Sequence, residues 1–200
     1  MKIAFEVNGV LRNTFGKAEE VYQKFFIDDY VQGDDEEDFE FKLNLPITST
    51  TLSNHFVFPD EERLMEFFYV DFPMNIFGHS QSTENSTFHD LNDIYKDLRD
   101  DHELVIVSNE IEKSKPATLF FLSKFGCMFE KIIFYNQFTE EDILSDFDLI
   151  ISAQPQILEK DYNYKTVKYK TTYNEEVSSD FEIETLKEFK DLYEKLNLKW

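Results

Sequence analysis

Phe5-Glu6-Val7-Asn8-Gly9-Val10-Leu11 is the stretch that decides the fold of this 200-residue chain. The run from Lys2 to Val7 predicts a short apolar strand, and Asn8-Gly9 is a turn dipeptide that ends it. A turn directly after a buried strand often needs a positive φ or a close backbone approach, so Gly9 is expected to serve the backbone. A polar stretch and a helical pattern around Glu19 to Phe26 follow. A strand that runs into a glycine turn is a common setting for a functional site.

The second half of the chain alternates apolar strands with helices. Strands are predicted at Leu104 to Val107, Lys131 to Tyr135, Leu149 to Ile151 and Thr166 to Tyr169. Helices are predicted around Leu91 to Leu98, at Ser114 to Phe125 before Gly126, after a capping-box pattern at Thr139 to Asp142, and at Leu186 to Leu196. This spacing predicts right-handed βαβ crossovers and a parallel sheet covered on both faces. Because such sheets bind ligands beyond the carboxyl ends of their strands, chemistry is expected at Glu6 to Asn8, Ser108-Asn109, Tyr135-Asn136 and Ser152 to Gln154.

Residues 28–87 differ in character and predict an insertion, which leaves residues 1–27 and 88–200 as an α/β core. The insertion holds an acidic run at Asp34 to Asp38, an alternating segment at Phe39 to Leu43, and a Ser/Thr/Asn cluster at Ser80 to Thr87. The acidic run is expected to be a solvated loop, because nothing fixes its carboxylates in a converging geometry. The aromatic residues of the insertion either build a core of their own or form an interface. They are Phe56, Phe58, Phe67, Phe68, Tyr69, Phe72 and Phe77.

Charge and composition exclude several classes of protein. A formal net charge of -21 opposes attraction to a nucleic-acid backbone, and the lysine-containing segment Lys160 to Lys170 is interpreted as a polar loop leading into an edge strand. The single Cys127 excludes an internal disulfide, and no apolar run suits a signal peptide or a membrane span. We therefore expect an intracellular, cytoplasmic protein without direct contact to nucleic acid or membrane. Scarce Ala, Gly, Pro and Arg point to an AT-rich microbe or one of its viruses.

No other motif indicates a metal site or a hydrolase. The four histidines, His55, His79, His89 and His102, lack metal-ligand spacing. Ser80, Ser82 and Ser86 have no candidate base at a fixed spacing, so a hydrolase triad has no support. We expect no metal and no cofactor.

Four short segments resemble, in order, the four signatures of the haloacid dehalogenase-like (HAD) superfamily. Phe5 to Leu11 resembles the first, in which two aspartates flank one residue, and Glu6 and Asn8 stand in their places. Val105 to Asn109 is similar to the second, an apolar strand whose terminal Ser or Thr, here Ser108, contacts the phosphate.

The third and fourth signatures follow in the second half of the chain. Lys115, or alternatively Lys113, resembles the third-signature lysine. Asp148 to Pro155 resembles the fourth signature, with Ser152 and Ala153 in place of its acidic pair. The resemblance implies a Rossmann-like parallel sheet in the order 3-2-1-4-5, with helices on both faces and a cap-like insertion after the first strand unit.

The departures from the family pattern imply a degenerate site. In active relatives the first aspartate attacks phosphorus, the second moves a proton, and the fourth-signature carboxylates help to hold Mg²⁺. Glu6 is one methylene longer than aspartate, and Asn8 cannot exchange a proton as a carboxylic acid does. Ser152 and Ala153 leave too few anionic ligands. We therefore predict no catalytic residue and no metal among these positions.

Ser108 and Lys115 could still form a vestigial anion pocket. The alternative is that Ser108 merely ends a strand and Lys115 lies in a solvated helical turn. A further alternative is that Glu6 pairs with Lys115 and fills the pocket from within.

These observations favour a non-catalytic HAD-like structural or interaction protein, a pseudo-phosphatase. The expected partner is one or more proteins, bound through the aromatic insertion, and a phage virion or neck assembly is the expected setting. Two alternatives stay open: an active or atypical HAD phosphatase or nucleotidase, and a phosphate- or nucleotide-binding module. Restored carboxylates at residues 6, 8 and 152 are expected to be tolerated if the site is defunct.

Overall fold

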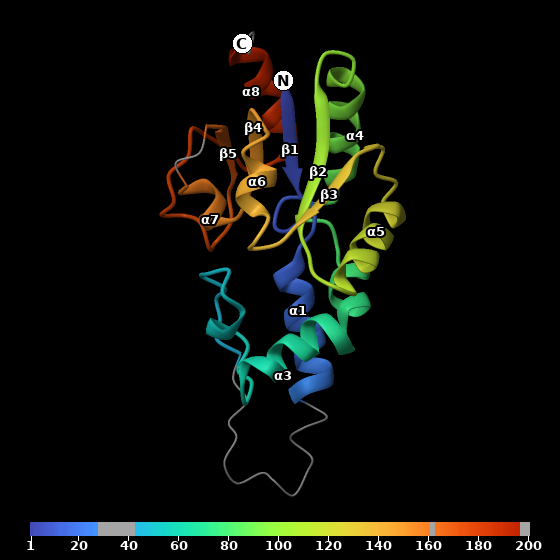
Figure 1. The fold of residues 1–200 in the computed structure, drawn as a ribbon, viewed down its shortest axis with the longest axis vertical. Helices are drawn as coiled ribbons and strands as arrows, with labels where there is room; N and C mark the ends of the chain where they lie inside the picture. Colours follow the sequence, from blue (N-terminus) through green and yellow to red (C-terminus); the bar gives the residue numbers. More distant parts are fainter. Residues whose placement is uncertain (28–42, 161–162, 197–200) are drawn as a thin grey trace, which may run out of the picture.

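The core of the molecule is a six-stranded parallel sheet in the order β3-β2-β1-β4-β5-β6. The computed structural model describes residues 1–27, 43–160 and 163–196. The strands are β1 (Lys2–Glu6), β2 (Glu103–Asn109), β3 (Ile132–Tyr135), β4 (Leu149–Ser152), β5 (Lys165–Tyr169) and β6 (Phe181–Ile183). β1 lies between β2 and β4, with Phe5 opposite Ile106 and Ile151 (Figure 1). The predicted order 3-2-1-4-5 is confirmed, and β6 extends the sheet beyond it.

Helices cover both faces of the sheet, because successive side chains of β1 point to opposite faces and are buried on both. Ile3 and Phe5 pack with side chains of α4 (Thr87–Leu98), α5 (Ser114–Lys124) and α8 (Leu186–Leu196). Ala4 packs on the opposite face with side chains of α6 (Glu140–Leu144) and α7 (Pro155–Leu158). Glu6 follows Ala4 by two residues and therefore points to the α6 and α7 face.

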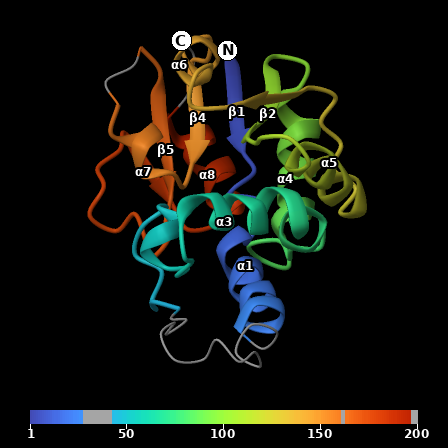
Figure 2. The ribbon, with the colours of Figure 1, turned by 60° about the horizontal axis from the view of Figure 1, so that its bottom comes forward.

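The insertion lies beyond the carboxyl end of β1, where Figures 1 and 2 show α1 and α3 against the end of the sheet. Its described elements are α1 (Thr14–Tyr22), the π-helical turns η1 (Gln23–Ile27), η3 (Phe67–Asp71) and η4 (Met74–Gly78), the short 3₁₀ helix η2 (Leu52–Asn54), and α3 (Glu61–Glu66). Ala18, Val21 and Tyr22 of α1 belong to the insertion's own core. α1, which precedes the predicted boundary at residue 28, thus shares a hydrophobic core with the insertion.

The seven aromatic residues of the insertion pack together into a core. Phe56, Phe67, Phe68 and Phe77 are buried, and Phe58, Tyr69 and Phe72 are half-buried. The rings meet edge to face or stacked, for example Phe56 with Phe68 at 5.2 Å between ring centroids. Of the two alternatives for this set, the packing supports a core of the insertion and not an interface, because these side chains hold the insertion together.

Local turn chemistry was predictable in part. Gly9 has φ +82°, as predicted for the turn after the first strand, and Gly126 has φ +67°, as is typical of a glycine that ends a helix. The predicted capping box at Thr139 does not form, because Thr139 Oγ1 accepts a hydrogen bond from the Asn136 N–H and Glu140 is buried beside Lys160.

The acidic run Asp34 to Asp38 and residues 39–42 lie outside the described residues. Among the described helices, none is long and apolar enough to cross a bilayer.

Candidate functional site

Glu6 ends the central strand with its carboxyl group buried. The residue is 0% exposed, and its two oxygens accept hydrogen bonds from hydroxyl groups of two other strands. Tyr135 at the end of β3 donates to Oε1 at 2.8 Å, and Ser152 at the end of β4 donates to Oε2. Burial raises the pKa of Glu6 to about 8, and the two hydroxyl donors oppose this shift only in part. At neutral pH the group is therefore mostly a neutral carboxylic acid, and in that form its own O–H donates to one of these two hydroxyl oxygens, which can donate or accept.

Asn8 is fixed by partners on every side of its amide and backbone. Its Oδ1 accepts hydrogen bonds from Arg12 Nη2 at 2.6 Å and from Thr14 Oγ1 at 2.8 Å. Its Nδ2 lies 3.5 Å from Ser108 Oγ, and its carbonyl accepts from Gln154 Nε2 at 3.2 Å. Asn8 therefore works as a connector of the loop after β1 to its surroundings.

Arg12 brings a buried positive charge to the same strand ends. The residue is 0% exposed, and its Nη2 lies 2.6 Å from Glu110 Oε1 in an ion pair whose two side chains are fully buried. Its Nη1 donates to Thr118 Oγ1 at 2.5 Å and to the Phe77 carbonyl at 3.3 Å. The guanidinium also lies over the Phe77 ring at 5.0 Å from the centroid. One arginine thus joins the loop after β1, the insertion and α5.

Glu110 is the anion of this network. Its Oε1 accepts from Arg12, from Ser108 Oγ at 3.1 Å and from Thr118 Oγ1 at 2.7 Å. Among the described residues its Oε2 is buried and has no hydrogen-bond partner. The hydroxyl that the resemblance assigns to phosphate contact, that of Ser108, is therefore directed to a carboxylate of the chain itself.

The possible anion pocket of Ser108 and Lys115 does not form, and Lys115 lies in a solvated helical turn as the alternative has it. Ser108 is 0% exposed and bound to Glu110, whereas Lys115 is exposed. The alternative Lys113 is also exposed and donates to the Val70 carbonyl. The helical phase of α5 explains this, because its buried face is Ser114, Ala117, Thr118, Phe121 and Leu122. That phase brings Thr118 inward and leaves Lys115 in solvent. The alternative in which Glu6 pairs with Lys115 is therefore wrong as well, because Glu6 is bonded to Tyr135 and Ser152.

The remaining predicted positions lie together at the strand ends. Ser152 holds Glu6, and its Oγ accepts from the Gln154 N–H at 2.9 Å. Ala153 is fully buried, and its Cβ would lie 2.8 Å from a Cβ added at Gly9. These residues stabilise the end of β4 against the loop after β1.

Sequence reasoning missed Arg12, Glu110 and Thr118. Arg12 is one of only three arginines in the chain and follows the apolar Val10-Leu11, which is the one signal that could have drawn attention to it. Its partner is 98 residues away in sequence. No spacing rule connects them, because both arrive through the pairing of β1 with β2.

These residues do not fit the magnesium site that the resemblance to the HAD superfamily implies. Mg²⁺ requires anionic or carbonyl oxygens arranged around it at close range. Here both oxygens of Glu6 accept from hydroxyls and the Asn8 carbonyl accepts from Gln154. Within the described part of the chain, no group of three or more His, Cys, Asp or Glu residues is placed to hold a metal ion.

Two cavities adjoin this end of the sheet. The smaller has a volume of about 170 Å³ and lies between the strand ends and the insertion. Its lining residues are Glu6, Asn8, Gly9, Thr14, Phe15, Ala18, Thr50, Leu52, Phe68, Tyr69, Phe77, Asn109, Gln154, Gln156 and Tyr173.

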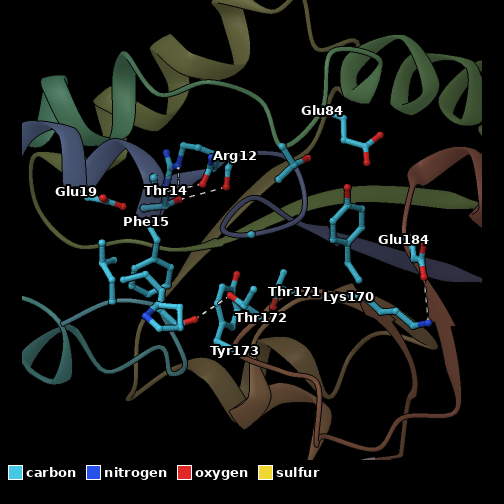
Figure 3. Close-up of a pocket in the computed structure, with 18 residues that line it drawn as sticks. Arg12, Thr14, Phe15, Glu19, Glu84, Lys170, Thr171, Thr172, Tyr173 and Glu184 are labelled. Atoms are coloured by element: carbon cyan, nitrogen blue, oxygen red, sulfur yellow. Dashed lines mark hydrogen bonds and ion pairs between the residues drawn. The ribbon is translucent and has the colours of Figure 1, made fainter. Parts of the chain in front are cut away.

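The larger cavity, of about 790 Å³, opens beside the end of β5. Figure 3 shows Thr14, Phe15 and Glu19 on one side of it and Thr171 to Tyr173 on another. Lys170 reaches toward Glu184, at 3.4 Å, and so does not leave a free cation in the cavity wall (Figure 3). Arg12 also lines it, but its charge is taken up by Glu110.

The histidines hold structural or surface positions. His55 is buried and bonded within the insertion to the Asn44 carbonyl and to Ser49. His102 lies 2.6 Å from the Tyr193 hydroxyl, which ties β2 to α8. Among the described residues, no histidine is hydrogen-bonded to Glu6 or to the strand ends around it.

Comparison with known proteins identifies the fold. No protein-family model matches the chain, and no curated protein matches its sequence. A protein classed as a haloacid dehalogenase-like hydrolase from Burkholderia xenovorans LB400 superposes with a TM-score of 0.61 at 10% identity, over 98% of this chain and 97% of that one. A HAD-superfamily hydrolase of subfamily IA from Geobacter sulfurreducens superposes with a TM-score of 0.54 at 13% identity, over 96% and 98%.

A third structure supports the same assignment. YfnB from Bacillus subtilis, classed as a HAD hydrolase and crystallised with magnesium, gives a TM-score of 0.52 at 13% identity, over 98% of both chains. At these identities the likeness concerns the fold alone. This chain has the haloacid dehalogenase-like fold.

Proposed function

We propose that this chain is a non-catalytic protein with the HAD-like fold, which uses the scaffold for binding and performs no phosphoryl transfer. One observation carries the proposal. The two carboxyl groups at the strand ends, those of Glu6 and Glu110, are both buried and held by side chains of the protein itself.

A nucleophilic role for Glu6 is opposed by its protonation and burial. An attacking carboxylate must be ionised and must reach the phosphorus atom. With a pKa of about 8, roughly a tenth of the Glu6 groups are ionised at neutral pH. The residue is also 0% exposed, so neither condition is met without rearrangement.

Binding of a phosphate at Ser108 is opposed by Glu110. Phosphate binding relies on cations and hydrogen-bond donors that face the ligand. Here Arg12 Nη2, Ser108 Oγ and Thr118 Oγ1 each donate to Glu110 Oε1. A phosphate in this position would meet a carboxylate, and the cation that would attract it is already paired.

The partner that we propose is a protein, and a virion assembly is the proposed setting. The aromatic core of the insertion is not available for contact, so the support comes from another surface. Val70, Met74, Leu119 and Phe120 are large apolar side chains that are each about two-fifths exposed. Met74 Sδ and Phe120 Cδ1 both lie near Gly78, which places η4 and α5 on a shared apolar face.

An atypical HAD enzyme is the second candidate. It is favoured by the likeness to hydrolases and by the cavity that adjoins Glu6. Such an enzyme would need Glu6 to lose its proton on binding substrate and Arg12 to leave Glu110.

A phosphatase assay separates the two candidates. The wild-type chain and Glu6→Gln are incubated with a panel of phosphate esters, with and without Mg²⁺, at several pH values. We expect both to match a blank without protein. Turnover by the wild type that disappears in Glu6→Gln, while it persists in the remote surface variant Phe138→Ser, would overturn the proposal.

A further inference from the structure

We infer that the small cavity between the strand ends and the insertion binds an uncharged single-ring molecule with an amide-like edge, the size of a pyrimidine base. The inference rests on the proposed function in one respect, because it requires that the cavity does not receive a phosphate. It is carried by the volume, charge and hydrogen-bonding groups of the cavity.

The volume of the cavity selects a small ligand. About 170 Å³ is close to the roughly 150 Å³ that accommodates a benzene ring in an engineered protein cavity. It lies below the range of about 300 to 1,000 Å³ that is common for drug-sized ligands. A single ring fits this volume.

The lining of the cavity contains no lysine and no arginine. Its one carboxyl group is that of Glu6, whose oxygens already accept from Ser152 and Tyr135. An anion would therefore enter without a cation to pair with, at a full desolvation cost. An organic cation would find no ionised carboxylate at neutral pH, since burial raises the pKa of Glu6 to about 8. The electrostatics favour a neutral ligand.

Four side-chain amides line the cavity, and they come from three strand ends and a helix: Asn8, Asn109, Gln154 and Gln156. Gln154 and Gln156 bond to one another, and Gln156 Oε1 accepts from Thr50 of the insertion at 3.4 Å. Asn109 lies at the exposed rim of the cavity, and in the described part of the chain its side chain has no hydrogen-bond partner. A primary amide offers one acceptor and two donors, which match the adjacent N–H and C=O of a lactam. Asn109 is therefore the residue that we expect to read the ligand edge.

Aromatic rings supply the apolar part of the lining. Phe15 and Tyr173 are in contact, with 5.4 Å between their centroids, and Tyr69 stacks on Phe77 at 5.5 Å. Planar heterocycles stack on such rings with little dependence on their substituents. The aromatic walls and amide edge together suit a flat ring with polar atoms on one side.

Calorimetry and ligand-observed NMR with uracil test the inference, with nicotinamide as a second neutral ring and inorganic phosphate as the charged comparison. The proteins are the wild type, Asn109→Leu, and the matched control Asn85→Leu, which makes the same change at an exposed loop amide outside the cavity lining. Melting curves check that each is folded. Gln156→Leu gives a second variant of the cavity should Asn109→Leu fail to fold.

We expect uracil to bind the wild type and Asn85→Leu equally, and Asn109→Leu about tenfold more weakly or not at all. Phosphate should neither bind nor displace uracil. The inference is wrong if no neutral ring binds, if phosphate competes, or if both cavity variants bind as the wild type does. Its failure is distinct from that of the proposed function, because phosphate ester turnover is measured separately and concerns Glu6.

Discussion

Two carboxyl groups are buried at the same end of the sheet, and their surroundings differ in one respect. Glu110 faces the guanidinium of Arg12, whereas Glu6 is hydrogen-bonded to the hydroxyls of Tyr135 and Ser152 and is affected by the like charge of Glu140. The first arrangement keeps an ionised pair inside the protein, and the second favours the neutral acid. The same end of the fold thus holds a charged half, Arg12 with Glu110, and a neutral half around Glu6.

Under the proposed function, these two halves explain how the strand ends of this fold can keep polar residues without performing phosphoryl transfer. In the charged half, the Arg12 cation is paired with a carboxylate of the protein itself. In the neutral half, the Glu6 carboxyl group is buried away from solvent. Polar residues at strand ends are therefore not evidence of catalysis until their partners are known.

The largest expected effect comes from breaking the charged half. Arg12→Met leaves the Glu110 carboxylate buried without a cation, and breaking such a pair costs about 3 to 5 kcal/mol of unfolding free energy. Urea unfolding measures it. The double variant Arg12→Met with Glu110→Gln should recover part of the loss, because no uncompensated charge remains.

Arg99→Met is the matched control for that change. Arg99 is half exposed and lies 3.8 Å from Asp100, so its loss should cost less than about 1 kcal/mol. Equal effects of the two arginine changes would contradict the claim that the charged half is a structural ion pair.

The neutral half should reveal itself through pH. The pKa of Glu6 is raised by folding from 4.5 to about 8, so its contribution to stability is complete below the unfolded pKa. As pH rises from about 5 to 8, the unfolded chain loses this proton first and stability falls by on the order of 1 kcal/mol per pH unit. Glu6→Gln should remove this slope and be the more stable protein near pH 8. Parallel stability profiles for the two proteins would show that Glu6 is ionised when folded.

Gly9 lies between the two halves and should not tolerate a side chain. Its φ is +82°, and an added Cβ would lie 2.2 Å from the Tyr173 hydroxyl oxygen. We expect Gly9→Val to cost about 1 to 3 kcal/mol by denaturant unfolding. An unchanged midpoint would mean that the turn can rearrange and that the two halves are not held in a fixed relation.

The smallest effect concerns the hydroxyl that resembles a phosphate contact. Ser108→Ala removes one donor to Glu110 Oε1, for which we expect a loss of about 1 kcal/mol. Thr118→Val makes the equivalent change in the same network and serves as its comparison. A Ser108→Ala protein with unchanged stability but altered binding of phosphate would assign Ser108 to a ligand site.

The fold was largely predictable because it depends on local patterns. Fully apolar runs such as Leu104 to Val107 and Leu149 to Ile151 predicted buried parallel strands, and the resemblance to the HAD superfamily implied the order of the first five strands. The strand β6 was missed because it has only three residues and carries Glu182 at its centre. The packing of α1 with the insertion could not be read from the sequence, because α1 follows the first strand of the core directly along the chain.

The site was predictable only as a set of positions. Glu6, Asn8, Ser108 and Ser152 do meet at the strand ends, as parallel pairing requires. Their partners depend on helical phase and on contacts between distant segments, which no spacing reveals. Restoring aspartate at residue 152 illustrates the difference: sequence suggests a tolerated change, whereas the structure would place a second carboxyl group against that of Glu6.

The most direct test of the account is a titration of the Glu6 carboxyl carbon by ¹³C NMR, without and with millimolar Mg²⁺. The account predicts a midpoint at a pH of about 8 that Mg²⁺ does not move, because the group is buried, neutral and already bonded to Tyr135 and Ser152. The Glu6→Gln variant assigns the signal. A midpoint near the ordinary value of 4.5, or one that Mg²⁺ lowers, would contradict it and would make Glu6 a ligand or nucleophile of a working site.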